Sequence, residues 1–160
     1  LYEDIQRPNE AEAAARKAAE LFHEQQRPDE EAAAYNFLAL LRLGLGKVAE
    51  AEKLAATASK LLEKSTNASK RLAAEITATR LLHASGKSKE ALRRLAKLID
   101  TSRKQKLILR EYEARLAQGE IELAAGMMGL GRSHLTALAK DARAKGYENL
   151  AHRAEAILKG

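Results

Sequence analysis

Apolar residues recur every third or fourth position along most of this chain, which is the spacing of an amphipathic α-helix. The stretch from residue 48 to residue 64 shows this stripe most clearly, with apolar side chains at Val48, Ala51, Leu54, Ala55, Ala58, Leu61 and Leu62. Val, Ile and aromatic residues, which favour strands, are sparse, whereas Ala, Leu, Glu, Lys and Arg are abundant. The pattern therefore predicts an all-α protein.

Short polar or glycine-containing breaks divide the pattern into helices, so helices adjacent in sequence should pack antiparallel. The predicted units are a partial hairpin at 1–25, full hairpins at 30–64, 67–103 and 106–145, and a single capping helix at 148–158. Asp29, Asn67 and Ser88 are expected to cap the helices that follow them. We expect a loop at 127–131, because three closely spaced glycines are unfavourable in a helix: Gly126, Gly129 and Gly131.

One short stretch returns at a spacing of forty residues. Gly46-Lys-Val-Ala-Glu-Ala51 is followed by Gly86-Lys-Ser-Lys-Glu-Ala91 and preceded by Gln6-Arg-Pro-Asn-Glu-Ala11, and Gly126 keeps the glycine. A period between 20 and 50 residues is typical of a solenoid built from stacked helical hairpins. In such a hairpin the glycine permits the turn, the glutamate lies in the first turn of a helix, and the alanine allows a close helix crossing. The fold class predicted is an all-α solenoid.

These residues resemble the tetratricopeptide (TPR) hairpin, in which a small residue ends helix A and an alanine opens the packing of helix B. Upstream of Gly46, the side chains of Tyr35, Leu38 and Ala39 match the aromatic, leucine and small positions of that family, and Ala58 matches a small position downstream. The period here is 40 rather than 34 residues, and there is no tryptophan. Repeats of the HEAT type, which have periods near 40, are the competing family.

The resemblance implies a non-catalytic scaffold that binds a peptide or helix of another protein on a concave face lined by the A helices. Carried over position by position, that face comprises Asn36, Leu40, Ile76, Arg80, His83, Leu116 and Glu120. One TPR subclass holds a C-terminal carboxylate with a lysine and asparagine set. The matching positions here lack that set, so a mixed apolar and charged groove is expected.

Charge is unevenly distributed along the 160 residues, whose net charge is +6. Residues 1–40 are acidic, whereas seven cations crowd into residues 93–110: Arg93, Arg94, Lys97, Arg103, Lys104, Lys106 and Arg110. This cluster favours an acidic partner and keeps nucleic acid as an alternative. Against nucleic acid, Tyr112 is the only aromatic residue near the cluster, and no pair of polar code residues recurs at the repeat period.

Candidate chemistry is scarce, so no enzyme activity, cofactor or metal is expected. The chain has no cysteine, its four histidines are not paired at helical spacing, and residues 126–131 lack the lysine of a phosphate loop. No apolar run approaches the length of a membrane span and no signal peptide is visible, so the expected location is cytoplasmic. The chain is expected to be a fragment of a larger protein, and self-association through open solenoid ends near Phe22 is a further possibility.

Overall fold

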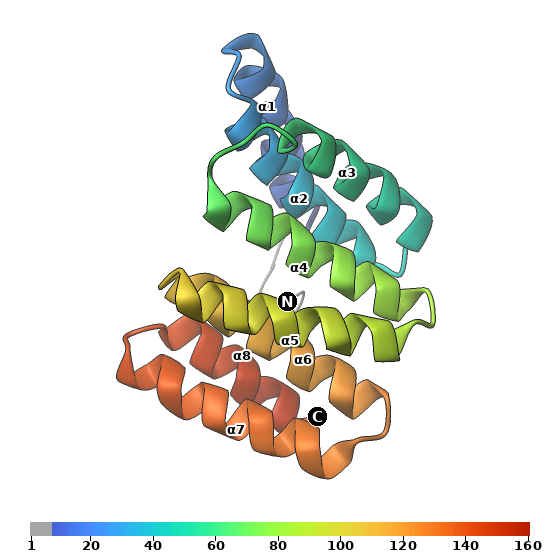
Figure 1. Cartoon of the computed structure of the whole chain (residues 1–160). Coiled ribbons are helices and arrows are strands. Elements are labelled where there is room, and N and C mark those ends of the chain that lie inside the picture. The colour runs from blue at the N-terminus through green and yellow to red at the C-terminus, as the bar shows by residue number, and fades with distance from the viewer. Residues whose placement is uncertain (1–7) are drawn as a thin grey trace. The chain divides into compact units, whose positions relative to one another are not determined.

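The computed structural model describes residues 8–160, and within this range every regular element is an α-helix (Figure 1). The described helices are α1 (Pro8–Glu24), α2 (Pro28–Gly44), α3 (Val48–Leu61), α4 (Ala68–Ala84), α5 (Ser88–Lys104), α6 (Ile108–Ala124), α7 (Met128–Ala144) and α8 (Glu148–Lys159). Within α1–α3 and within α5–α8, consecutive helices run in opposite directions and pack on their neighbours (Figure 1). The all-α prediction and the expected stack of repeated helices are confirmed. The part of the predicted first hairpin that precedes Pro8 lies outside the described residues.

The helices are evenly spaced along the chain, and two of them with their turns make up the forty residues of one repeat. Each described helix begins twenty residues after the previous one. Six of the turns have three residues, and the middle residue of each has a positive φ angle. At Gly46, where φ is 71°, its N–H bonds to Leu43 O and the N–H of Lys47 to Arg42 O. These two hydrogen bonds close the helix end with a residue in the left-handed conformation, which glycine favours.

The link from α3 to α4 is the exception, because it contains the longer segment 62–67. Asn67 caps α4 as predicted, since its Oδ1 accepts the N–H of Lys70 at 3.1 Å. The caps predicted at Asp29 and Ser88 are wrong: α2 and α5 start after Arg27 and Lys87, neither of which makes a side-chain cap. In both places the last residue of the preceding three-residue turn occupies the N-cap, so the turn fixes where the helix begins.

The loop predicted at 127–131 is also wrong, because α7 begins at Met128 and includes two of the glycines. The third, Gly126, supplies the turn with φ of 80°. Gly131 lies against Leu123 of α6, and a Cβ atom there would come within 2.8 Å of the Leu123 side chain. The glycine therefore permits a close helix crossing, and this packing offsets its low helix propensity.

Residue contacts divide the chain into two compact units, Leu1–Leu81 and Leu82–Gly160, referred to as unit 1 and unit 2. In unit 1, α4 contributes Ala74 and Leu81 to clusters formed by small residues of α2 and α3. In unit 2, α6, α7 and α8 share one cluster of buried side chains: Tyr112, Leu116, Leu135, Leu138, Ala139, Ala142, Leu150, Ala151 and Ala154. Each unit thus has a core made where the stripes of successive helices meet.

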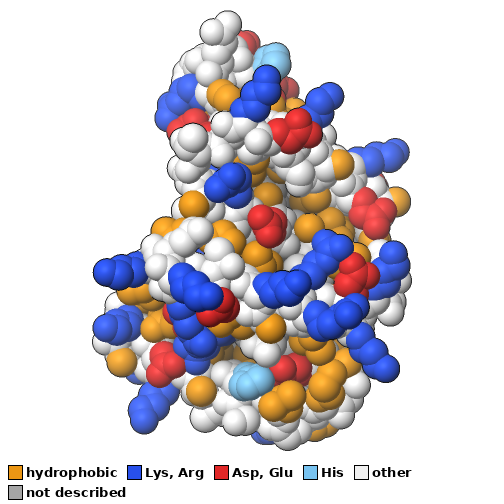
Figure 2. Space-filling view, viewed as in Figure 1, with side chains coloured by type: hydrophobic (Ala, Val, Ile, Leu, Met, Phe, Trp, Pro, Cys, Tyr) orange, Lys and Arg blue, Asp and Glu red, His pale blue; other side chains and the backbone are white. Residues whose placement is uncertain are grey.

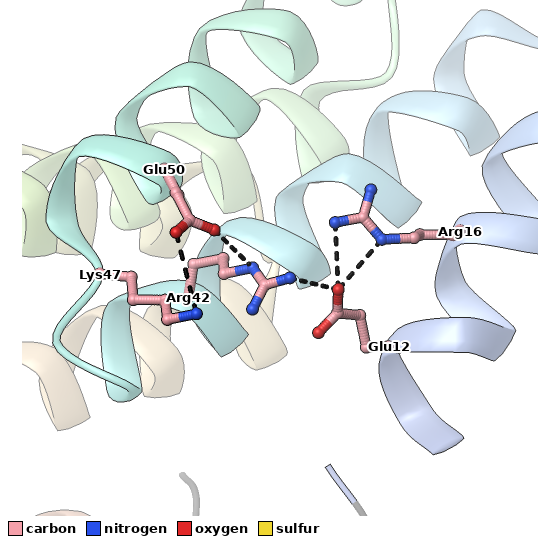
Figure 3. A network of polar contacts seen from close by, with 5 residues as sticks. All are labelled: Glu12, Arg16, Arg42, Lys47 and Glu50. Carbon is pink, nitrogen blue, oxygen red and sulfur yellow. Dashed lines mark hydrogen bonds and ion pairs between the residues drawn. The ribbon is translucent and has the colours of Figure 1, made fainter. Parts of the chain in front are cut away.

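A chain of ion pairs ties the first three helices of unit 1 together (Figure 3). Arg42 at the end of α2 contacts Glu12 of α1 and, at 3.1 Å, Glu50 of α3. Arg16 pairs with the same Glu12 at 3.0 Å, and Lys47 lies 3.8 Å from Glu50. The repeated glutamate at position 50 therefore binds a neighbouring helix in addition to lying near its own helix N-terminus.

Candidate functional site

Unit 2 contains a groove of about 300 Å³ between α5, α6 and α7. Its lining residues come from all three helices: Ala96, Ile99, Arg103, Arg115, Gln118 and His134. Two of these helices, α6 and α7, cross closely at two glycines. A Cβ atom on Gly119 would lie 2.5 Å from Leu135 of α7, and the same closeness holds between Gly131 and Leu123. The two glycines therefore allow α6 and α7 to pack closely in the part of unit 2 that contains the groove.

Arg115 is the best-anchored cation of the groove. One guanidinium nitrogen lies 2.8 Å from Asp141 Oδ2 of α7, and another lies 3.6 Å from Glu111 Oε1. The guanidinium also stands over the Tyr112 ring, 5.5 Å from its centre. With 14% of its side chain exposed, Arg115 is a fixed positive group at the floor of the groove.

Arg103 at the rim is the more accessible guanidinium. Its Nε donates to Glu111 at 2.8 Å while 56% of its side chain remains exposed. An exposed pair of this kind is worth at most about 1 kcal/mol, so a competing acidic ligand can take the Arg103 guanidinium over. The rim therefore offers a cation that can change partners.

The third charged element is a buried carboxylate facing a histidine. Glu122 of α6 is 2% exposed, and its Oε2 lies 2.7 Å from His134 Nδ1. A buried carboxylate is costly unless a donor satisfies it, and His134 fills that requirement. Because Nδ1 is engaged by Glu122, the ring nitrogen that remains for a ligand in the groove is Nε2. The arrangement can bind a ligand but holds no nucleophile next to a base.

Tyr112 lies next to Arg115 and is buried. This burial raises the pKa of the Tyr112 phenol, and the negative charge of Asp141 raises it further. The Tyr112 hydroxyl donates to the Asp141 backbone oxygen at 3.3 Å, and its ring meets Tyr147 edge-on at 5.5 Å. The phenol therefore acts as a neutral structural support for Arg115.

A second surface of unit 2 is the outer side of α5, which borders the groove. At 100° per residue, four cations fall within an arc of about 80° and a length of about 22 Å, which we call the α5 stripe: Lys89, Arg93, Lys97 and Lys104. Lys104 pairs with Asp100 at 2.7 Å, whereas the other three form no ion pair within the described chain. Lys and Arg side chains gather on the molecular face where Figure 1 places α5 (Figure 2). The stripe is thus largely free for a ligand.

Four residues of the predicted concave face belong to unit 1. Asn36 and Leu40 lie one turn apart on α2 and are half-buried, as is Arg80 on α4. The Asn36 Oδ1 atom is buried without a hydrogen-bond partner. Ile76, at 5% exposed, belongs to the buried residues of α4. The set therefore mixes packing positions with boundary positions.

The other three belong to unit 2. Leu116 is fully buried between α7 and α8, so its side chain has no surface for a partner. Glu120 is half-buried one turn later on α6. His83 is half-buried, and its Nδ1 lies 2.9 Å from Ser88 Oγ across the turn. None of the seven predicted residues lines the groove.

Sequence reasoning missed Arg115, Gln118 and His134, because they stand on two helices and belong to no local cluster. The forty-residue repeat could have indicated the lining positions, because the same positions line a groove in two successive repeats. A second groove of about 490 Å³ between α7 and α8 uses the positions forty residues later: Thr136 for Ala96, Ala139 for Ile99, Arg143 for Arg103, Glu155 for Arg115 and Leu158 for Gln118. A groove that recurs at the repeat period is a property of the architecture, and only its side chains differ.

Comparison with protein-family models, with curated proteins and with solved structures found no match. Within residues 8–160, no three acidic or histidine side chains are grouped as a metal site would need. None of the helices in that range has the length and apolar character needed to cross a membrane.

Proposed function

We propose that this chain is a non-catalytic, TPR-like binding scaffold whose unit 2 docks an acidic protein segment. The observation that carries this is the α5 stripe, where Lys89, Arg93 and Lys97 lack acidic partners within the described chain. Residues 87–106 hold eight Lys and Arg against Glu90 and Asp100, which equals the net charge of +6 of the whole chain. A local excess of positive charge raises the association rate of a negatively charged partner.

The groove beside the stripe supports a protein partner in particular. Ala96 and Ile99 give it an apolar wall, and Gln118 adds an amide that can bond to a peptide backbone. Successive cations of the stripe at i and i+4 stand about 6 Å apart, which suits acidic side chains spaced along an extended or helical segment. Side chains anchored in the groove would set the register of that segment, while the stripe supplies attraction.

The predicted concave face is kept in a reduced form within this proposal. His83 and Glu120 of unit 2 retain partial exposure and are proposed as secondary contacts there, and the partly exposed Leu40 and Arg80 are proposed as contacts of unit 1 by itself. Ile76 and Leu116 are assigned to packing instead, because their side chains are buried.

Nucleic acid is the second candidate, favoured by the same unpaired cations. Binding of a single strand also draws on aromatic platforms for the bases. The two aromatic residues of unit 2 do not provide one, since Tyr112 is 5% exposed and Tyr147 packs edge-on against it. An acidic protein segment therefore fits the surface better.

The test compares two probes on the same protein: a fluorescent peptide of alternating Glu, Asp and Leu, and a single-stranded oligonucleotide of equal net charge. Titration at about 0.05 and 0.15 M salt should show tighter binding of the peptide. In Arg93→Glu/Lys97→Glu its affinity should fall at least tenfold. Lys53→Glu/Lys60→Glu on the exposed side of α3 makes the same charge change and should lose less than threefold. Equal losses in the two variants, or preference for the oligonucleotide, would reject the proposal.

A further inference from the structure

Two guanidinium groups of unit 2 converge on a single carboxylate oxygen. Glu111 Oε1 accepts a hydrogen bond from Arg103 Nε at 2.8 Å, and Nη1 of Arg115 lies 3.6 Å from the same oxygen atom. The two arginines, which we call the arginine pair, come from α5 and α6, and both line the groove. The carboxylate of Glu111 is therefore an anion that the arginine pair already holds beside the groove.

The two members of the arginine pair differ in how firmly they are held. Arg115 is mostly buried, is bonded to Asp141 at 2.8 Å and stands over the Tyr112 ring. Arg103 is mostly exposed, and its hydrogen bond to Glu111 uses Nε, so its terminal N–H donors remain for another acceptor. A ligand anion placed between them meets one fixed cation and one that can turn toward it.

An incoming carboxylate gains little at the arginine pair, because it must replace the carboxylate of Glu111. A phosphate gains more, since at neutral pH it carries a charge of about −1.5 to −2 and three strong acceptor oxygens. These oxygens can accept from both guanidiniums at once. Glu111 can give way, because it lies in the first turn of α6, where unpaired backbone N–H groups stabilise a carboxylate. Glu111 is thus a resident competitor that favours ligands of higher charge than its own.

The surroundings of the arginine pair suit one phosphorylated side chain of a protein. A volume of about 300 Å³ is at the lower end for small-molecule sites, so the groove takes a side chain more readily than a large cofactor. Ala96 and Ile99 form an apolar wall for its carbon atoms, and Gln118 and His134 Nε2 are further polar partners. Residues 103–110 contain four Lys and Arg and no acidic residue, so the charge at this end of the groove favours a dianion.

We propose that the groove of unit 2 binds a phosphoserine or phosphothreonine of the acidic segment, with the phosphate held between Arg103 and Arg115 in place of Glu111. This site rests on the proposed function, because the α5 stripe still supplies the attraction for the segment as a whole. Phosphorylation of the partner then converts a weak association into a tighter one.

The test compares two fluorescent peptides of the same length and net charge. Both alternate Glu, Asp and Leu, and they differ at two central positions, which are phosphoserine and Gln in one peptide and two Glu in the other. Titrated at about pH 7.5 and about 0.15 M salt, the phosphopeptide should bind about tenfold more tightly. Because the net charges match, such a difference reports on the phosphate group itself.

Four variants locate the phosphate. In Arg103→Gln the two peptides should bind with similar affinity, because the exposed half of the arginine pair is gone. Lys104→Gln removes the same charge at the next position, which is exposed, and should weaken both peptides equally while the difference remains. Glu111→Gln removes the resident carboxylate and should tighten the binding of both peptides about threefold. Glu113→Gln, whose carboxylate pairs with Arg110, makes the same charge change on α6 and should have a smaller effect.

The results separate the phosphate site from the proposed function. Equal affinity of the two peptides for the unsubstituted chain would overturn the site and leave the proposed function standing, whereas binding of neither peptide would overturn both. A difference that survives in Arg103→Gln would also overturn the site, because the phosphate would then lie elsewhere. An oligonucleotide with a terminal phosphate that binds more tightly than the phosphopeptide, and loses this advantage in Arg103→Gln, would overturn it by making nucleic acid the occupant.

Discussion

Within residues 8–160, two residues other than glycine adopt a backbone conformation that favours glycine. Gln26 and Lys106 have φ angles of 54° and 58° in turns whose other members use glycine. For a residue with a Cβ atom, this left-handed conformation costs about 1–2 kcal/mol of folding free energy. Both turns nevertheless keep the full hydrogen-bond pattern of the glycine turns. The structure therefore contains two sites at which one substitution should relieve strain.

Replacing Lys106 by glycine should stabilise unit 2. Relief of the left-handed strain exceeds the extra flexibility of glycine in the unfolded chain, so we expect a gain of about 0.5–1 kcal/mol. Lys106 is exposed, so little contact is lost. Urea denaturation followed by circular dichroism measures the change. Gly86→Ala is the matched opposite, with a similar loss expected at φ of 81°. A less stable Lys106→Gly chain would contradict the argument.

The glycines inside helices divide into those that a neighbour crowds and those that none approaches. A Cβ atom on Gly119 would lie 2.5 Å from the buried Leu135 side chain, so Gly119→Ala should cost about 1–3 kcal/mol despite a better helix propensity. Gly129 in the first turn of α7 has nothing within 4 Å of that point, so Gly129→Ala should stabilise by up to about 1 kcal/mol. Thermal unfolding of both variants measures the pair. Equal signs would show that the crossing of α6 and α7 is looser than described.

At the scale of the element, the sequence predicts where helices lie better than where they begin. The glycines at 46 and 86 marked two of the turns, and Asn67 marked a cap. The turns at Gln26 and Lys106 carry no glycine, so the glycine pattern of the sequence does not mark them. Glycine was also misleading at Gly131, where it serves packing between helices rather than a loop.

The candidate site was predictable only in part. Arg103 belongs to the basic cluster seen in the sequence, but its pairing with Glu111 joins two helices and depends on how they pack. Arg115 and His134 each stand next to carboxylates from neighbouring helices, at Asp141 and Glu122. A sequence lists these charges without showing which are neutralised. That information arises only when the helices assemble.

The pairing of α7 with α8 gives a pH-dependent contribution to stability. The guanidinium of Arg143, bonded to Glu155 at 2.7 Å, holds the pKa of that carboxyl below its ordinary value. The contribution is therefore present above the pKa of the unfolded chain and is lost as pH falls through the lower pKa of the folded chain. A carbon-13 titration of Glu155 should show its pKa rising toward the ordinary value in Arg143→Gln. Glu30, whose pKa is lowered chiefly by Lys70, is the internal control and should not change. A Glu155 titration unchanged by Arg143→Gln would show that the pair does not form in solution.

At the scale of the whole molecule, the excess of positive charge is concentrated in one region of the sequence. The helix α5 and its flanking turns carry as large a positive excess as the entire chain, while the first forty residues are acidic. Net charge alone would treat every lysine as equivalent. The field that a partner meets instead depends on where cations line up on one surface and on which carboxylates stand beside them.

This difference is measurable without any knowledge of the partner. Arg93→Glu/Lys97→Glu and Lys53→Glu/Lys60→Glu each lower the net charge from +6 to +2. A molecule that adsorbs through one patch should lose retention on a cation-exchange column mainly when that patch changes, so the α5 variant should elute at clearly lower salt than the α3 variant. Circular dichroism of both variants confirms that the helices remain. If the two variants elute at the same salt concentration, retention follows net charge. That result would contradict the proposal that the α5 stripe is the dominant binding surface.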